Sequence, residues 1–97
     1  MFRQGDVLLK KIKNLPKNLK EKDKIIAYGE VTGHKHQFLS EQVCVFQDEE
    51  QNQFIDVKQE AELMHEEHQK QIIPKGKYQV IIQREVDLLG EVRQVLD

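Results

Sequence analysis

The four histidines of this chain stand in two close pairs. The pairs are His34 and His36, in "TGHKHQF", and His65 and His68, in "MHEEHQK". Imidazole nitrogens bind zinc, iron, copper and nickel, and histidine also exchanges protons near neutral pH. The two pairs therefore predict one metal-binding histidine cluster, provided that the fold brings them together.

The spacing of the first pair suits a strand. Residues two apart on a strand lie on the same face, so the rings of His34 and His36 can converge on one ion. On a helix the same spacing would turn the two rings apart by about 200°. Gly33 before the pair and Phe38 and Leu39 after it favour a strand.

The second pair needs a bend in the chain. His65 and His68 are three apart, so a straight strand would point them to opposite faces. They share a face in a helical turn, or across a hairpin with Glu66 and Glu67 as its turn. "EAELM" favours a helix by propensity, whereas "QKQIIP" is typical of a strand. We favour a turn, or a short helical turn, between two strands. The metalloprotease signature H-E-x-x-H is excluded, because its histidines are four apart.

Four histidines could form either a structural or a catalytic metal site. A structural zinc site is closed by four ligands, whereas a catalytic site keeps three ligands and a water molecule. We expect a divalent transition metal, which is zinc, manganese or iron. One histidine is then free to transfer protons, as are Glu66 and Glu67. Arg84, in "IIQREV", is a candidate to hold a phosphate or carboxylate, and a surface ion pair with Glu85 is the alternative.

The elements that must position these residues are mainly strands. Short apolar runs alternate with turn signals, which predicts a mainly β fold, either a small barrel or a rolled antiparallel sheet. A lysine-rich loop is expected between the first two strands, and a short helix at the end of the chain, begun by Asp87. The expected strands are 7–12, 25–31, 42–47, 54–58 and 78–86, the loop is 13–24, and the helix is 87–96.

Size and charge narrow the classes of partner. The length of 97 residues predicts a single domain, 1–97, and the net charge of -2 favours neither nucleic acid nor membrane. The lysine-rich loop 13–24 is a candidate phosphate-binding patch, but we favour a solvated linker because it has no aromatic to stack on bases. We expect an anionic small-molecule substrate, no membrane association, and a surface compatible with a homo-oligomer.

The single cysteine indicates a reducing compartment, because Cys44 has no partner for an internal disulfide. Its place in "QVCVFQ" predicts a small core residue. No apolar run approaches the roughly 20 residues that span a bilayer, and the first residues lack a signal-peptide pattern. We therefore expect a cytoplasmic protein.

Two resemblances add to these expectations. "GEVTGHKHQFLSE" resembles the first cupin motif, which implies His34, His36 and Glu41 as ligands, but Gln79 stands where the second cupin motif has its histidine. "RQGDVLL", "GEVTGHKH", "HEEH", "IPKGKYQV" and "QREV" together resemble a group of short, uncharacterised bacterial and phage-type proteins. This second resemblance supports the four histidines as a site and implies no reaction.

Two functional hypotheses remain open. The first is a metal-dependent hydrolase, in which the histidine cluster activates water against an anionic substrate such as a phosphodiester. The second is a non-catalytic β-module that a metal stabilises and that binds a protein or nucleic-acid partner.

Overall fold

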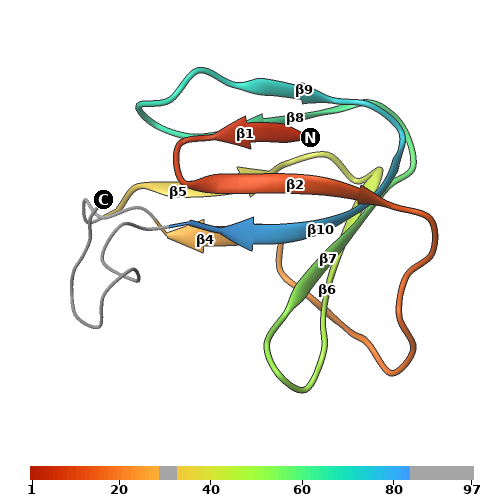
Figure 1. Ribbon diagram of the computed structural model, residues 1–97. Helices are drawn as coiled ribbons and strands as arrows, with labels where there is room; N and C mark the ends of the chain where they lie inside the picture. The colour runs from red at the N-terminus through yellow and green to blue at the C-terminus, as the bar shows by residue number, and fades with distance from the viewer. Residues whose placement is uncertain (29–32, 84–97) are drawn as a thin grey trace.

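Strands form all the regular structure that is described. The computed structural model describes residues 1–28 and 33–83, and within them the chain forms two antiparallel sheets and no closed barrel (Figure 1). The expected mainly β fold is confirmed. The expected helix 87–96 and Arg84 lie outside the described residues. The strands are β1 Phe2–Gln4, β2 Val7–Ile12, β3 Lys20–Lys22, β4 Ile25–Tyr28, β5 Lys35–Phe38, β6 Val43–Gln47, β7 Gln53–Val57, β8 Ala61–Met64, β9 Gln71–Ile73 and β10 Gly76–Ile82.

The larger sheet has the order β1-β2-β10-β7-β6-β3. The expected strands 7–12, 42–47 and 54–58 are confirmed as β2, β6 and β7, and the last two pair with each other as a hairpin. The hairpin turn is held by Asp48, whose Oδ1 accepts hydrogen bonds from the backbone N–H groups of Glu50 and Asn52, both at 2.9 Å. An aspartate that bonds the backbone ahead of it is a typical turn former. β10 ends at Ile82, earlier than the expected strand 78–86.

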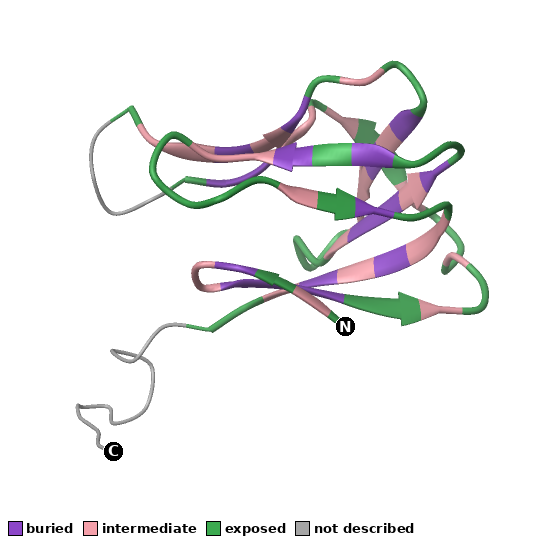
Figure 2. Ribbon diagram, turned by 90° about the horizontal axis from the view of Figure 1, so that it is seen from above, coloured by how far each residue is buried: buried purple, intermediate pink, exposed green. Residues whose placement is uncertain are grey.

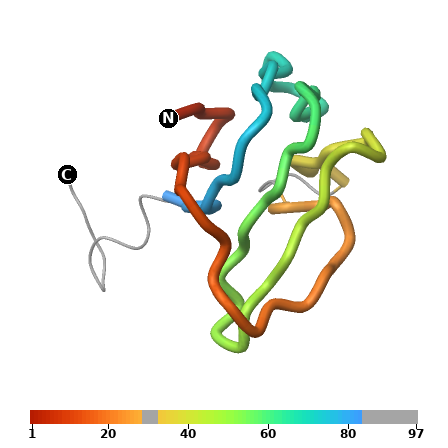
Figure 3. The backbone as a smooth tube through the Cα atoms, turned by 90° about the vertical axis from the view of Figure 1, so that its right-hand side faces the viewer, coloured from red at the N-terminus to blue at the C-terminus, as the bar shows by residue number. Residues whose placement is uncertain are grey.

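One connection crosses the end of this sheet. Residues 13–19 leave β2 and reach the far edge of the sheet, where β3 pairs with β6 (Figure 3). The expected continuous loop 13–24 is therefore wrong at residues 20–22. The residues Lys, Glu and Lys gave no apolar pattern from which to predict this strand. Edge strands commonly carry charged side chains, because these protect the unpaired side of the strand.

The smaller sheet carries both histidine pairs and has the order β4-β5-β8-β9. The ambiguous segment 60–70 resolves into β8, a turn at residues 65–68, and then β9. This is the favoured expectation of a turn between two strands. β1 of the larger sheet lies beside β9, so the two sheets meet near the histidines (Figure 1).

The core lies between the sheets, and buried residues alternate with less buried ones along β5, β6, β8 and β10 (Figure 2). Cys44 is only half-buried, because Val43 and Val45 supply the buried face of β6. The expectation of Cys44 as a core residue is therefore wrong. The core comprises Val7, Leu9, Ile26, Ala27, Phe38, Val43, Val45, Ile55, Val57, Ala61, Leu63, Ile73, Tyr78 and Val80.

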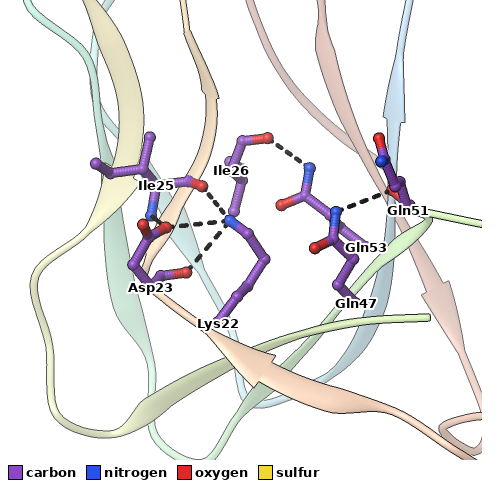
Figure 4. A network of polar contacts seen from close by, with 7 residues as sticks. All are labelled: Lys22, Asp23, Ile25, Ile26, Gln47, Gln51 and Gln53. Carbon is purple, nitrogen blue, oxygen red and sulfur yellow. Dashed lines mark hydrogen bonds and ion pairs between the residues drawn. The ribbon is translucent and has the colours of Figure 1, made fainter. Parts of the chain in front are cut away.

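Polar contacts also join the two sheets. The side-chain amide of Gln53, on β7, donates a hydrogen bond of 2.7 Å to the carbonyl of Ile26, on β4 (Figure 4). Beside it, Lys22 and Asp23 form an ion pair at 3.1 Å, and this contact with Lys22 lowers the pKa of Asp23. Membrane-crossing helices are not found in the two described ranges.

Candidate histidine site

The four histidine rings meet at one place between the two sheets. His65 is the central ring, with centroid distances of 4.3 Å to His36, 4.5 Å to His68 and 5.7 Å to His34. The rings of His36 and His68 are 6.0 Å apart and nearly parallel. The geometric expectation that the second pair shares a face and points at the first pair is confirmed. We call these four residues the histidine cluster.

Gln4 fixes the orientation of His36. The amide nitrogen of Gln4 donates hydrogen bonds to the carbonyls of Leu63, at 2.8 Å, and Gln69, at 3.1 Å. Its oxygen, Oε1, therefore faces His36 and lies 2.9 Å from Nδ1. An amide oxygen only accepts, so Nδ1 of His36 carries a proton. In the neutral ring, the lone pair is then on Nε2.

That Nε2 atom faces a carboxylate. Oδ1 of Asp6, in the turn between β1 and β2, lies 3.6 Å from Nε2 of His36. His36 itself is 1% exposed, so this contact is at the inner end of the cluster. A carboxylate oxygen and a nitrogen lone pair are both acceptors, so they suit a cation between them, either a proton or a metal ion.

His65 organises the turn after β8. Its Nδ1 accepts hydrogen bonds from the backbone N–H groups of Glu67, at 3.0 Å, and His68, at 3.1 Å. Burial, followed by repulsion from His68, lowers the pKa of His65. Both observations favour a neutral ring with its proton on Nε2. His65 therefore acts in this arrangement as the cap of its own turn.

The two glutamates of the turn have different contacts. Oε1 of Glu66 accepts a hydrogen bond of 2.8 Å from the backbone N–H of Lys35, and this bond lowers the pKa of Glu66. Glu66 thus ties the turn to the start of β5. Oε2 of Glu67 instead lies 3.5 Å from Nδ1 of His34. Both glutamates are exposed, and Glu67 is the better placed to exchange protons because Glu66 is engaged by the N–H of Lys35.

Gly5 makes room for His68. The ring of His68 covers Gly5 so closely that a Cβ at this position would lie 2.6 Å from Nε2. Gly5 also has a φ of 61°, in the left-handed region that side chains disfavour. The β1–β2 turn thus supplies both the space for His68 and the carboxylate of Asp6.

The side chains as they stand do not form a metal site. Within residues 1–28 and 33–83, no three histidine, cysteine or acidic side chains are arranged to hold a metal ion. Two of the ring nitrogens are already hydrogen-bonded, Nδ1 of His65 to the backbone of the turn and Nδ1 of His36 to Gln4. In addition, the rings pack face to face or edge to face. Binding of a metal would require the more accessible rings, His34 and His68, to rotate.

Three residues of the site, Gln4, Gly5 and Asp6, were not predicted from the sequence. Gln4 is 2% exposed and reaches residues 59 and 65 positions away in the sequence. The one available signal was a Gly-Asp turn next to a polar residue in an apolar surrounding. The remaining expected site residue, Arg84, is not among the described residues.

The comparisons with known proteins give a family and no activity. A family described as a domain of unknown function (DUF8820) matches residues 3–83. The chain belongs to this family. The matched range contains every residue of the site just described, from Gln4 to His68. No curated protein and no solved structure matches the chain significantly.

Proposed function

We propose that this domain binds a divalent transition metal through its histidine cluster and uses the metal to hydrolyse an anionic substrate. The observation that carries the proposal is the pair of acceptors formed by Nε2 of His36 and Oδ1 of Asp6, 3.6 Å apart. Gln4 holds His36 in the tautomer that directs a lone pair at this point. Metal-binding histidines commonly have such a hydrogen-bond partner on the other ring nitrogen.

The separation of the rings also suits a metal. Two imidazoles bound to a tetrahedral zinc ion, with Zn–N distances of about 2.0–2.1 Å, have ring centroids roughly 5 Å apart. Among the rings proposed below as ligands, those of His36 and His68 have centroids 6.0 Å apart, about 1 Å more than this value. Rotation of the exposed His68 side chain would bring its nitrogen closer to the point that Nε2 of His36 faces.

The residues of the cluster divide into fixed and adjustable members. His36 is buried and oriented by Gln4, so it is the fixed ligand, with Asp6 as a further ligand or as its partner. His68 is exposed and His34 is half-buried, so their rings can turn toward the same point. His65 is the histidine left over for positioning or for proton transfer, because its Nδ1 is bonded to the turn. With Asp6 as the partner of His36 and not as a ligand, the three histidines leave a fourth coordination position open.

An open position supports a catalytic function. Zinc, manganese or iron bound there would lower the pKa of a water molecule and so supply hydroxide near neutral pH. Glu67 is the best-placed group to accept its proton, since Glu66 is engaged by the N–H of Lys35. Arg84 stays our candidate for the anion of the substrate, for example a phosphodiester.

A non-catalytic function is the second candidate, and one observation favours it. The cluster links the β1–β2 turn of the larger sheet to β5 and β8 of the smaller sheet. A metal bound at such a junction would stabilise the fold directly. The domain would then present a metal-stabilised surface to a protein or nucleic-acid partner.

The likeness to a cupin motif and the cellular location are smaller parts of the proposal. The cupin likeness would add Glu41 to the ligands, but Glu41 is exposed in the turn before β6, and we leave it out. The lone Cys44 supports a reducing, cytoplasmic location. The bacterial and phage-type resemblance agrees with that location.

Metal titration of protein made without a histidine tag tests the proposal. Calorimetry with Zn²⁺, with Mn²⁺, and with Fe²⁺ under anaerobic conditions should give one site for at least one metal. His68→Ala should weaken metal binding at least tenfold, because it removes one of the proposed ligands. His68 is exposed, so its loss should leave the core intact. Glu41→Ala is the matched control and should bind as the wild type does. Absence of binding for all three metals, or equal binding by His68→Ala, would contradict the proposal.

A chelator separates the two candidate functions. A structural metal belongs to the folding free energy, so its removal should lower the melting temperature strongly. A catalytic metal should leave the fold intact and should abolish hydrolysis of bis(p-nitrophenyl) phosphate, a simple phosphodiester. Glu67→Gln should then reduce the rate of hydrolysis with little change in metal affinity.

A further inference from the structure

Five lysines line a groove at the end of the larger sheet. The groove has a volume of about 810 Å³ and lies where β2 and β7 end and β10 begins (Figure 1). Ile12, Val57 and Gly76 contribute its apolar lining, and Asp56 is the one acidic residue in the lining among residues 1–28 and 33–83. The basic residues come from three separate segments of the chain: Lys11, Lys13, Lys58, Lys75 and Lys77.

This groove is distinct from the histidine cluster. Asp6 directly precedes β2, whereas Lys11 and Lys13 lie at and just beyond the other end of that strand. Six strand residues at about 3.3 Å each put roughly 20 Å between the two places. The lysines therefore do not serve the metal proposed above, and the groove needs an explanation of its own.

The charge of the groove contrasts with that of the chain. The whole chain carries a net charge of -2, yet five lysines face one aspartate here. Elsewhere, Lys22 and Lys70 form ion pairs with Asp23 and Glu62. In the part of the chain that the structure describes, none of the five groove lysines has a carboxylate within 4.0 Å. Like charges held together without counter-charges favour the binding of an anion.

Side chains pack closely around Gly76, in the lining of the groove. Gly76 pairs with Val57 across β10 and β7, and the side chain of Lys11 crosses above it. A Cβ at Gly76 would lie 3.3 Å from Cε of Lys11 and 3.3 Å from the hydroxyl of Tyr78. Lys77 stands directly opposite Asp56, which offsets part of its charge, so the other four lysines carry most of the positive potential.

We propose that this groove binds a chain of phosphate groups. Lysine ammonium groups act as point charges toward phosphate, and five of them along an open groove suit several phosphates in a row rather than one. The ligand is the backbone of a nucleic acid strand or a free polyphosphate. No aromatic residue lines the groove, so it has no surface for base stacking, and binding should be independent of sequence.

Binding of a fluorescein-labelled 20-nucleotide single strand, followed by anisotropy, tests this proposal. With four or five phosphate contacts, log K against log salt concentration should have a slope of about -3, since each contact contributes about -0.7 for single strands. Lys13→Ala, Lys58→Ala and Lys75→Ala combined should reduce the slope to about -1 and weaken binding at least tenfold at low salt. The three lysines are exposed, so the triple variant should fold, which its unfolding curve verifies.

A matched triple variant is the control. Lys17→Ala, Lys20→Ala and Lys70→Ala combined removes the same charge from exposed positions outside the groove and should leave the slope near that of the wild type. Inorganic tripolyphosphate as competitor distinguishes the sources: displacement at equal phosphate concentration indicates a free polyphosphate, and weaker displacement indicates a nucleic acid backbone. No binding at low salt, or equal losses in both triple variants, would overturn the proposal.

Discussion

Gln4 and His36 form a buried hydrogen bond that joins the two sheets. Oε1 of Gln4 lies 2.9 Å from Nδ1 of His36, and the two residues are 2% and 1% exposed. The first belongs to β1 at the edge of the larger sheet and the second to β5 of the smaller sheet. The orientation of the most buried histidine is thus set by a residue from the other sheet.

Replacement of Gln4 should destabilise the protein. Gln4→Ala removes the side-chain partner of three groups, which are the carbonyls of Leu63 and Gln69 and Nδ1 of His36. Each such group costs about 1–3 kcal/mol, so the free energy of unfolding should fall by roughly 3 kcal/mol. Urea unfolding measures this loss. Gln59→Ala, at an exposed position, is the control, and equal stability of the two variants would rule out the described role of Gln4.

Alanine substitutions at two glycines separate the effect of His68 packing on stability from the effect of backbone strain. Gly5 and Gly33 both have a positive φ, 61° and 88°. Alanine at either position should cost about 1 kcal/mol for the left-handed backbone. Only at Gly5 would the new Cβ meet the ring of His68, whereas a Cβ at Gly33 has no described atom within 4 Å.

Gly5→Ala should therefore lose more stability than Gly33→Ala, and it should also lose metal affinity. The measurements are urea unfolding and calorimetric titration with Zn²⁺. Equal effects of the two substitutions on both quantities would show that His68 has no close packing on Gly5.

The contact between Glu66 and Lys35 should be visible in hydrogen exchange. The N–H of Lys35 donates to Oε1 of Glu66 at 2.8 Å, so exchange at this amide requires the contact to open. In Glu66→Ala the Lys35 amide should exchange faster, and in Glu67→Ala it should exchange as in the wild type. NMR of the two variants reads this one amide directly, and unchanged exchange in Glu66→Ala would contradict the contact.

The turn cap of His65 predicts a pH dependence of stability. Burial lowers the pKa of His65 below its ordinary value of 6.5. Above pH 6.5 the ring is neutral in both the folded and the unfolded chain, so its contribution is fully present. As the pH falls from 6.5 through the folded pKa, the unfolded chain binds a proton that the folded chain resists, and stability is lost.

His65→Asn should reduce that loss, because asparagine also accepts hydrogen bonds from a following turn but does not titrate. Melting temperatures of metal-free wild type and variant, measured between pH 7.5 and 5, test this. The wild type should decline more steeply below pH 6.5. Parallel declines would mean that His65 does not resist protonation in the folded state.

Much of the fold could be predicted from alternation of apolar and polar residues and from turn signals. β6 was found by its alternation, whereas β2 and β7 were found as short β-rich runs between turn signals. β1 and β3 were missed: each has three residues at a sheet edge and has no long periodic pattern. The buried face of β6 was assigned to the wrong side for Cys44, since both faces of this strand carry apolar residues.

The candidate site was predictable in part. The spacing predicted that the chain must bend for His65 and His68 to face one partner, whereas the meeting of the two pairs was an expectation that depended on the fold. The contribution of Gln4 and Asp6 could not be predicted, because it depends on how β1 packs beside β9. The distinct contacts of Glu66 and Glu67 depend on the register of the turn, which two identical neighbouring residues do not reveal.

The links from Gln4 to Leu63, Gln69 and His36 have a kinetic consequence. They span 59, 65 and 32 positions of the sequence, so they form only after distant segments of the chain have come together. Closing such loops costs entropy before the contact is gained. Because Gln4 belongs to one sheet and His36 to the other, the ring of His36 should become immobile only when the two sheets dock, which makes it a reporter on the rate of docking.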